Sequence, residues 1–224
     1  MKPRLENALS FVVAACAVAV AGVYVYAQAF APNPDEFRNP KPTFVDNWKT
    51  LHEGGLRIGR QSAPVQIVEF GDFECPFCKT FHGDIERIIG EFDGQVALVY
   101  YHFPLPTHPH AEAAARAATC AADQDRFAEM ARALYAHQDS LGEIPWGRYA
   151  SAAGVGDSSS FATCMSLETT VERVSRDKAV GTQLAVKATP TLIVNGWRFA
   201  MPPLPDTLRY IVREVIAGRS PFPK

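Results

Sequence analysis

Charge of one sign is not in excess in this 224-residue chain, and cysteine is scarce. Lysine and arginine number 22 against 24 aspartate and glutamate residues, which gives a formal net charge of −2. Because nucleic acid is held by a surplus of positive charge, this balance argues against RNA or DNA as a partner. The five cysteines are too few for a disulfide-stabilised mini-protein. With 47% hydrophobic residues the chain can still bury a core, and its length corresponds to one large domain or two small ones.

The N-terminal segment lacks charge over a length that matters for membranes. Leu9–Ala27 is a run of 19 residues without a charged side chain, long enough to cross a bilayer as a helix. Lys2 and Arg4 precede this run, so the positive-inside tendency places the N-terminus in the cytoplasm and the remaining chain outside. We therefore expect residues 1–30 to be a membrane anchor or a signal peptide. Ala27-Gln28-Ala29 fits a cleavage site, but the length of the run favours a retained anchor.

Proline marks the region after this run. Residues 31–55 begin with prolines interspersed among polar side chains, a composition that predicts a stiff, extended linker outside the membrane. The folded domain is expected to span residues 56–218, and residues 219–224 form a short tail. No internal repeat occurs in the chain, and beyond the linker there is no low-complexity segment.

The hydrophobic pattern of the expected domain predicts the order β-α-β, a block of helices, then β-β-α. The expected elements are a strand at Val65–Phe70, a helix from Pro76 to about Ile89, a strand at Val96–Phe103, helices within residues 109–186, strands at Thr191–Val194 and Arg198–Met201, and a helix at Pro205–Ala217. Asn195-Gly196 between the last two strands is a strong hairpin signal. The fold class is therefore α/β, one sheet with a helical insertion at about residues 109–186.

Two of the cysteines form the motif Cys75-Pro76-Phe77-Cys78. Such a motif is a redox dithiol, half of a metal site, or a structural bridge. A metal site needs two further soft ligands at short spacing, and Cys120 and Cys164 do not provide that spacing. His108 and His110 flank a proline and are better explained by a loop before a helix. We therefore expect no metal.

A redox role has a physical basis in the position of the motif. It follows a strand and opens a helix, so Cys75 lies where unpaired N–H groups and the helix dipole stabilise a thiolate. The thiolate is the attacking species in disulfide exchange. Pro76 suits the first helical turn, where its missing N–H costs nothing. Cys78, one turn further on, is placed to resolve a mixed disulfide formed at Cys75.

Two other features support this interpretation. Thr189-Pro190 directly precedes a strand, where a cis proline would let the Thr189 backbone offer an N–H and a C=O to a bound peptide. In the strand before the motif, alternation puts Glu69 on the same face as Val65 and Ile67. A carboxyl on an apolar face should have a raised pKa and could relay the proton of Cys78. The alternative is that the strand twists and Glu69 reaches solvent.

The chain closely resembles the DsbA-like branch of the thioredoxin superfamily from about Gly59 to Ala217. The matching residues are Gly59-x-x-x-Ala63-Pro64-Val65-x-Ile67-Val68-Glu69-Phe70-x-Asp72-Phe73-x-Cys75-Pro76-Phe77-Cys78, Phe103-Pro104-Leu105-Pro106 with His108-Pro109, and Ala188-Thr189-Pro190-Thr191 with Asn195-Gly196.

The resemblance implies a thioredoxin fold with an inserted helical domain, a cis proline at Pro190, and thiol–disulfide oxidoreductase activity on secreted proteins. The active-site dithiol would be Cys75 and Cys78, supported by Pro76 and Phe77, with no cofactor beyond the redox-active disulfide. The expected partners are unfolded or reduced secreted polypeptides and a membrane quinone-linked reoxidising protein, DsbB-like or VKOR-like, or else a reducing protein. The chain would act as a monomer outside the cytoplasm.

The sequence departs from the family pattern at two places. The strongest oxidants of the family carry histidine between the cysteines, whereas Phe77 supplies no cation to the thiolate. Some members pair the buried acid with a lysine on the adjacent strand, where this chain offers Tyr100. We therefore expect a reduction potential between about −270 mV for thioredoxin and about −120 mV for DsbA.

The second cysteine pair is open to several interpretations. Cys120 and Cys164 both fall on inward faces of expected helices. They could be two buried thiols, a structural disulfide, or a secondary redox pair. In an oxidising compartment two cysteines left over after one adjacent pair favour a structural bridge, and similar proteins often carry such a pair in this region.

Several other functions compete with this interpretation. A reductase or isomerase would run the same dithiol in the opposite direction, although isomerases are usually dimers and no dimerisation domain is visible here. A thioredoxin-fold chaperone or copper metallochaperone would normally have wider cysteine spacing and a downstream histidine. A peroxidase would normally use a lone reactive cysteine.

Overall fold

The computed structural model describes residues 18–24, 26 and 41–223, and the chain divides into two units, Met1–Pro40 and Lys41–Lys224. Of the first unit, residues 18–24 and 26 are described, and they are helical and exposed. Within the described residues we found no helix with both the length and the apolar character that a bilayer crossing requires. Most of the expected membrane-spanning run Leu9–Ala27 lies outside the described residues, as does the start of the expected linker, residues 31–40.

In the described part of the chain the second unit is built on a six-stranded sheet with the order β1-β6-β5-β3-β4-β2. The strands are β1 Thr43–Phe44, β2 Leu56–Ile58, β3 Val65–Gly71, β4 Val96–His102, β5 Thr191–Val194 and β6 Trp197–Phe199. Strands β3 and β4 run parallel because helix α3 (Pro76–Glu91) crosses between them, and the other pairs are antiparallel.

Every residue of β3 and β4 is buried, which fits their near-continuous run of valine, leucine and aromatic side chains. Alternation divides these side chains between the two faces of the sheet. Val65 and Ile67 pack with α3 and with α9 (Pro205–Ile216), whereas Val68 and Phe70 join a separate cluster on the other face. The redox motif therefore begins directly beyond a strand that is fixed on both faces.

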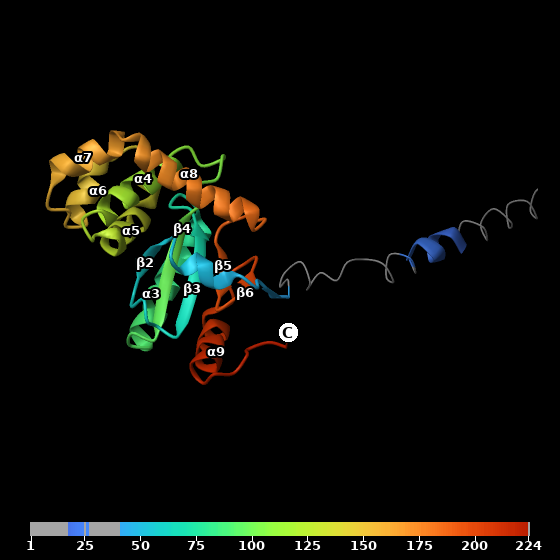
Figure 1. Cartoon of the computed structure of the whole chain (residues 1–224). Coiled ribbons are helices and arrows are strands. Elements are labelled where there is room, and N and C mark those ends of the chain that lie inside the picture. Colours follow the sequence, from blue (N-terminus) through green and yellow to red (C-terminus); the bar gives the residue numbers. More distant parts are fainter. Residues whose placement is uncertain (1–17, 25, 27–40, 224) are drawn as a thin grey trace, which may run out of the picture. The chain divides into compact units, whose positions relative to one another are not determined.

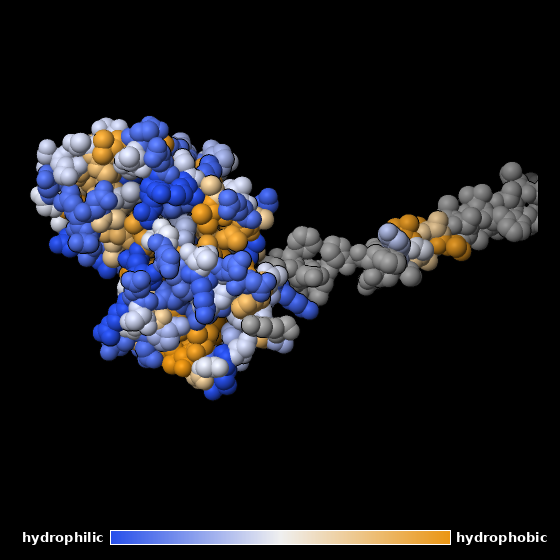
Figure 2. All heavy atoms as spheres, viewed as in Figure 1, coloured by the Kyte–Doolittle hydropathy of each residue, from blue (hydrophilic) through white to orange (hydrophobic). Residues whose placement is uncertain are grey.

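The expected helical insertion is a compact group of helices gathered at one end of the sheet, with α9 at the opposite end (Figure 1). Its elements are α4 Ala111–Ala122, α5 Phe127–Ala136, the 3-10 helix η2 Gln138–Ser140, α6 Trp146–Ala152, α7 Ser158–Ser166 and α8 Glu168–Gln183. Alanines 114, 117, 118 and 121 of α4 are fully buried, and their small side chains let the neighbouring helices approach closely. The outer surface of the folded unit is mainly hydrophilic in the view of Figure 2, with smaller apolar areas.

The structure differs from the expected linker of residues 31–55. Residues 43–55 belong to the folded unit, where β1 and the 3-10 helix η1 (Trp48–His52) precede β2. Strand β1 has only two residues, so it carries no readable alternation and depends on contacts with distant parts of the chain. The ring of Phe44 meets that of Trp197 at 5.2 Å, and the N–H of Val45 donates to the carbonyl of Gly196 at 2.8 Å.

Candidate active site

The motif Cys75-Pro76-Phe77-Cys78 lies at the start of α3, as the sequence predicts. Cys75 is the N-cap residue with an extended backbone, and Pro76 occupies the first helical turn. Both cysteines are free thiols in this structure, Cys75 with 3% of its surface exposed and Cys78 with none. Because the first N–H groups of a helix have no partner within it, those of Phe77 and Cys78 are free to donate to the Cys75 sulfur.

The two thiols are held at very different pKa values. Hydrogen bonding from the Cys78 thiol, followed by smaller contributions from Thr189 and from the backbone N–H groups of Cys78 and Phe77, outweighs burial and lowers the pKa of Cys75 to about 5. Burial, followed by the hydrogen bond to Cys75 and the charge of Glu69, raises the pKa of Cys78 well above its usual value. At neutral pH the reduced site therefore holds a thiolate at Cys75 and a protonated thiol at Cys78, as disulfide exchange requires.

Glu69 is fully buried, which excludes the alternative that it reaches solvent. Burial first, and then the negative charge of Cys75, raise its pKa to about 8. Neither of its carboxyl oxygens has a hydrogen-bond partner within the described part of the chain. The expected burial and raised pKa of Glu69 are thus confirmed, whereas its role as a proton relay for Cys78 stays a prediction.

Tyr100 lies opposite Glu69 in the parallel pairing of β3 with β4. Its hydroxyl is 3.2 Å from the hydroxyl of Tyr135 on α5, and both rings are buried. A Cβ on Gly71 would lie 2.6 Å from the Tyr100 hydroxyl, so only glycine fits at this position. On this side of Glu69 the structure therefore has a neutral pair of hydroxyls.

The Thr189-Pro190 bond is cis, and the Cys75 sulfur lies 3.3 Å from the Thr189 carbonyl, to which it donates only when it is protonated. Beside this bond lies an apolar groove of about 420 Å³. It is lined by Phe77, Thr80, Phe81, Asp84, Ala188, Thr189, Pro190 and residues 200–205. Phe77 is 70% exposed, so a large apolar side chain of the motif itself borders the groove.

Sequence reasoning missed the residues that support the active-site loop from the rest of the fold. Gln138 of η2 donates from its amide nitrogen to the carbonyls of Phe73 at 2.8 Å and Cys75 at 2.9 Å. The Asp72 carboxyl accepts from His108 Nδ1 at 2.7 Å. Asp72 and His108 were both in the motifs that carry the family resemblance, but their separation along the chain gave no signal of contact. Gln138 belongs to no motif.

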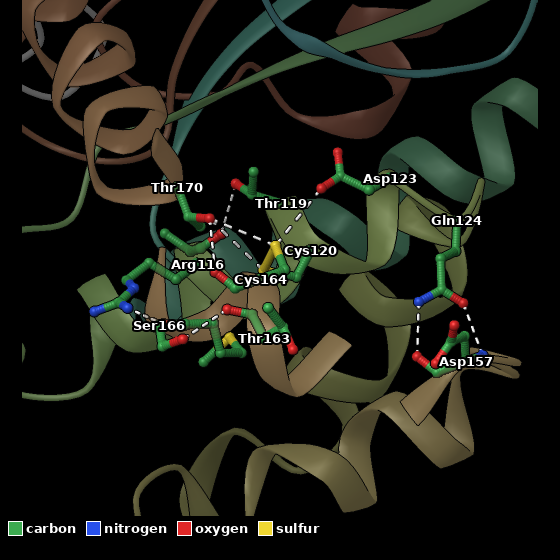
Figure 3. The surroundings of a disulfide bond; sticks show 12 residues. Arg116, Thr119, Cys120, Asp123, Gln124, Asp157, Thr163, Cys164, Ser166 and Thr170 are labelled. Carbon is green, nitrogen blue, oxygen red and sulfur yellow. Dashed lines mark hydrogen bonds between the residues drawn. A yellow bond between two sulfur atoms is a disulfide. The ribbon is translucent and has the colours of Figure 1, made fainter. Parts of the chain in front are cut away.

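The structure contains a disulfide between Cys120 of α4 and Cys164 of α7 (Figure 3). Their Cα atoms are 5.7 Å apart, within the range that a disulfide spans. Figure 3 shows the bridge beside the Thr170 hydroxyl, which is 3.4 Å from the Cys164 sulfur. The disulfide excludes two free buried thiols at these positions, whereas its purely structural role stays a prediction.

Metal ligands do not gather around the motif. The described residues contain no group of three or more histidine, cysteine, aspartate or glutamate side chains that could hold a metal ion. His108 and His110, the candidates noted in the sequence, contact acidic residues of the active-site loop instead, His108 through its ring and His110 through its backbone N–H.

Comparison with known proteins decides the family. Residues 51–214 match the model of a family described as thioredoxin. The chain belongs to the thioredoxin family. The matched residues include both cysteines of the motif, the cis proline, and the whole helical insertion.

Solved structures with the same fold include a protein described as a thiol–disulfide exchange protein. BdbD from Bacillus subtilis has a TM-score of 0.66 and 23% identity, with 80% of this chain and 98% of that one covered. The catalytic domain of ScsC from Proteus mirabilis has a TM-score of 0.66 and 19% identity over 78% of this chain and 99% of that one. The exchange protein alpha-DsbA2 from Wolbachia pipientis has a TM-score of 0.63 and 20% identity over 76% of this chain and 93% of that one. At these identities the likeness shows the fold.

Curated relatives are longer proteins. A protein of Mycolicibacterium gilvum named Na(+)/H(+) antiporter NhaA 1 is 43% identical over 164 residues, which are 72% of this chain and 26% of that protein. A protein of Salinispora tropica named Na(+)/H(+) antiporter NhaA 3 is 36% identical over 145 residues, 64% of this chain and 22% of that protein. The aligned part is therefore about a quarter of the length of these relatives.

Proposed function

We propose that this thioredoxin-family protein is a thiol–disulfide oxidoreductase that forms or exchanges disulfides in other polypeptides through Cys75 and Cys78. The observation that carries the proposal is the position of Cys75 at the start of α3, with its sulfur 3.3 Å from the carbonyl of the cis Thr189-Pro190 bond. In this setting the two thiol pKa values are displaced in opposite directions, downward at Cys75 and upward at Cys78. A structural thiol pair has no need of such a difference. An exchange site does, because one sulfur must attack as a thiolate while the other keeps its proton.

The chemistry needs no cofactor beyond the two sulfurs. A substrate thiolate attacks Cys75 Sγ of the oxidised pair, a mixed disulfide forms, and Cys78 Sγ leaves as a thiolate. A second substrate thiolate then attacks the substrate sulfur of the mixed disulfide and releases Cys75 as a thiolate. The substrate loses two electrons and two protons, and the Cys75–Cys78 disulfide gains the two electrons. Glu69, protonated near neutral pH, supplies the proton that Cys78 takes up.

The groove beside the cis proline accounts for substrate binding. An extended peptide can pair with the Thr189 backbone next to the Cys75 sulfur, and apolar substrate side chains can pack on Phe77, Met201 and Leu204, which are all exposed. Such binding depends on backbone and general apolar character, which suits unfolded or reduced polypeptides of varied sequence. Pro76 keeps the first helical turn of the site in place.

We further propose that the domain works outside the cytoplasm, held at the membrane by residues 1–30 or released if this leader is cleaved. The charge pattern around Leu9–Ala27 supports this placement. The Cys120–Cys164 disulfide supports it independently, because such bridges persist in oxidising compartments. The oxidised pair would be regenerated by a quinone-linked membrane protein, DsbB-like or VKOR-like. A reductase or isomerase supplied with electrons by a reducing partner is the second candidate, because the fold accommodates either direction.

The test uses the full-length protein. We expect the Cys75–Cys78 pair to equilibrate with glutathione and, once oxidised, to form disulfides in a reduced model polypeptide. Cys75→Ser should abolish the exchange, whereas Cys16→Ser removes a thiol outside the motif and should leave the rate unchanged. Exchange at full rate by Cys75→Ser would overturn the proposal. Reduction of a disulfide substrate with no oxidation of a dithiol substrate would favour the second candidate.

A further inference from the structure

Asp72 occupies a central position in the active-site loop, between the end of β3 and the start of α3. Its backbone N–H donates to Cys78 Sγ at 3.4 Å, and its carbonyl accepts from the N–H of Cys75 at 3.1 Å. Its Oδ1 accepts from the N–H of Glu74 at 2.8 Å. The backbone of this residue thus contacts both cysteines, and the carboxyl side chain determines where that backbone lies.

The second carboxyl oxygen of Asp72 is held by a different part of the chain. Oδ2 accepts from the N–H of Leu105 at 2.8 Å and from His108 Nδ1 at 2.7 Å. The Asp72 side chain is fully buried, and His108 is about a quarter exposed. These two hydrogen bonds fix the position of the buried Asp72 carboxyl, because hydrogen bonds to a carboxylate are stronger than those between neutral groups.

We propose that His108 is a positioning residue for the resolving cysteine: through the Asp72 carboxyl it holds the Asp72 N–H against Cys78 Sγ. The inference rests on the proposed exchange function of the same site. Neither the Thr189 carbonyl nor the Phe77 N–H, which face Cys75, depends on this link. The Asp72 N–H donates directly to Cys78 Sγ, whereas Asp72 contacts Cys75 only through the Cys75 N–H, so loss of the His108 bond should slow the step at Cys78 more than the first attack by Cys75.

The step affected is the closing of the Cys75–Cys78 disulfide. Cys78 Sγ, as a thiolate, attacks Cys75 Sγ of the mixed disulfide, forms the Cys75–Cys78 bond, and releases the substrate sulfur as a thiolate that takes up a proton. The cysteine pair is oxidised by two electrons and the substrate disulfide is reduced by two. Negative charge is shared with Cys78 Sγ in the transition state, where the Asp72 N–H stabilises it. The reverse step, in which Cys78 leaves, passes through the same transition state.

Two substitutions of equal shape separate the hydrogen bond from packing. His108→Asn keeps a donor in about the position of Nδ1, whereas His108→Leu fills the same space without a donor. In full-length reduced protein mixed with glutathione disulfide, rapid acid quenching and mass spectrometry follow formation and resolution of the Cys75 mixed disulfide. We expect His108→Leu to slow resolution about tenfold with formation changed less than about twofold, and His108→Asn to stay within about twofold of the unmodified protein in both steps.

His110→Ala is the matched control, because His110 lies in the same loop and contacts Glu74 through its backbone N–H, which the substitution keeps. It should resolve the mixed disulfide at the normal rate. Normal resolution by His108→Leu would overturn the inference, and so would equal slowing of both steps, which indicates a general loosening of the site. If His108→Leu does not fold, His108→Asn supplies the test. This variant keeps the donor, so if it resolves the mixed disulfide more than about tenfold more slowly than the unmodified protein, the inference is overturned. Absence of any exchange by the unmodified protein would instead refute the proposed function.

Discussion

Glu69 and Tyr100 lie opposite each other on adjacent parallel strands, both of them fully buried, and Tyr100 completes its hydrogen bonding with Tyr135 rather than with Glu69. Among the described residues, the Glu69 carboxyl has no hydrogen-bond partner. A carboxyl in this position stays protonated well above its ordinary range, because nothing nearby compensates for the loss of water.

Replacing Glu69 with glutamine should slow proton transfer at Cys78. An amide of the same shape cannot exchange a proton, so the step in which Cys78 leaves or attacks should slow by about ten- to a hundredfold, with the attack by Cys75 less affected. Stopped-flow measurement of mixed-disulfide resolution between pH 6 and 9 checks this. An unchanged rate and pH profile would remove Glu69 from the mechanism.

Glu69 should also make the fold less stable as the pH rises. Its pKa is raised from 4.5 to about 8 in the folded state, so the unfolded chain releases this proton first and stability falls between those two values. Over this pH range the free energy of unfolding would fall by about 5 kcal/mol because of Glu69. Chemical unfolding at pH 5 and pH 8 should show Glu69→Gln losing much less stability than the unmodified protein. Glu112→Gln, at an exposed carboxyl on α4, should follow the unmodified protein.

The Tyr100–Tyr135 pair should behave as one unit. Tyr100→Phe leaves the buried Tyr135 hydroxyl without its partner and should cost about 1 to 3 kcal/mol of unfolding free energy. Tyr135→Phe should cost a similar amount. The double variant leaves no hydroxyl unpaired and should be less destabilised than the sum of the single variants. Strict additivity in urea unfolding would show that the two hydroxyls do not interact.

The Cys120–Cys164 bridge should stabilise the fold without taking part in exchange. Its sequence separation of 44 residues corresponds to a loop-closure contribution of about 4 kcal/mol, an upper value in practice. Replacing both cysteines with serine should therefore lower the melting temperature while the Cys75–Cys78 pair keeps its potential. Exchange activity that disappears from the folded double variant would mean that the bridge is itself a redox centre.

The reduction potential should fall between those of thioredoxin and DsbA, about −270 and about −120 mV. The low pKa of Cys75 favours the thiolate and so stabilises the reduced state, but the side chain of Phe77 carries no positive charge that would stabilise the thiolate further. Phe77→His should raise the potential toward the DsbA value. Equilibration with glutathione measures the reduction potential of the unmodified protein and of the variant. A potential of the unmodified protein outside the interval between thioredoxin and DsbA would show that the thiolate is stabilised differently.

The sequence by itself determined the central β-α-β unit, the place of the dithiol at the start of a helix, the β-hairpin at Asn195-Gly196 and the helical insertion. Each of these rests on local patterns, such as alternation, helical spacing and a proline suited to the first turn. The same patterns placed Glu69 on an inward face, because alternation in a strand is a local property. The cysteine motif and its place before a helix predicted Cys75 and Cys78, and the position of Pro190 before a strand, together with the family resemblance, predicted its cis bond. The parts that these residues play in exchange stay predictions.

Only the tertiary structure decided what surrounds them. Strand β1 exists because Phe44 and Val45 meet the distant hairpin, and two residues carry no pattern of their own. The contacts of His108 with Asp72 and of Gln138 with the Cys75 carbonyl join residues tens of positions apart. Hydrogen bonding between side chains and backbone has no periodicity along the chain, so it depends on how the insertion packs against the sheet, and that packing is settled only when the whole domain folds.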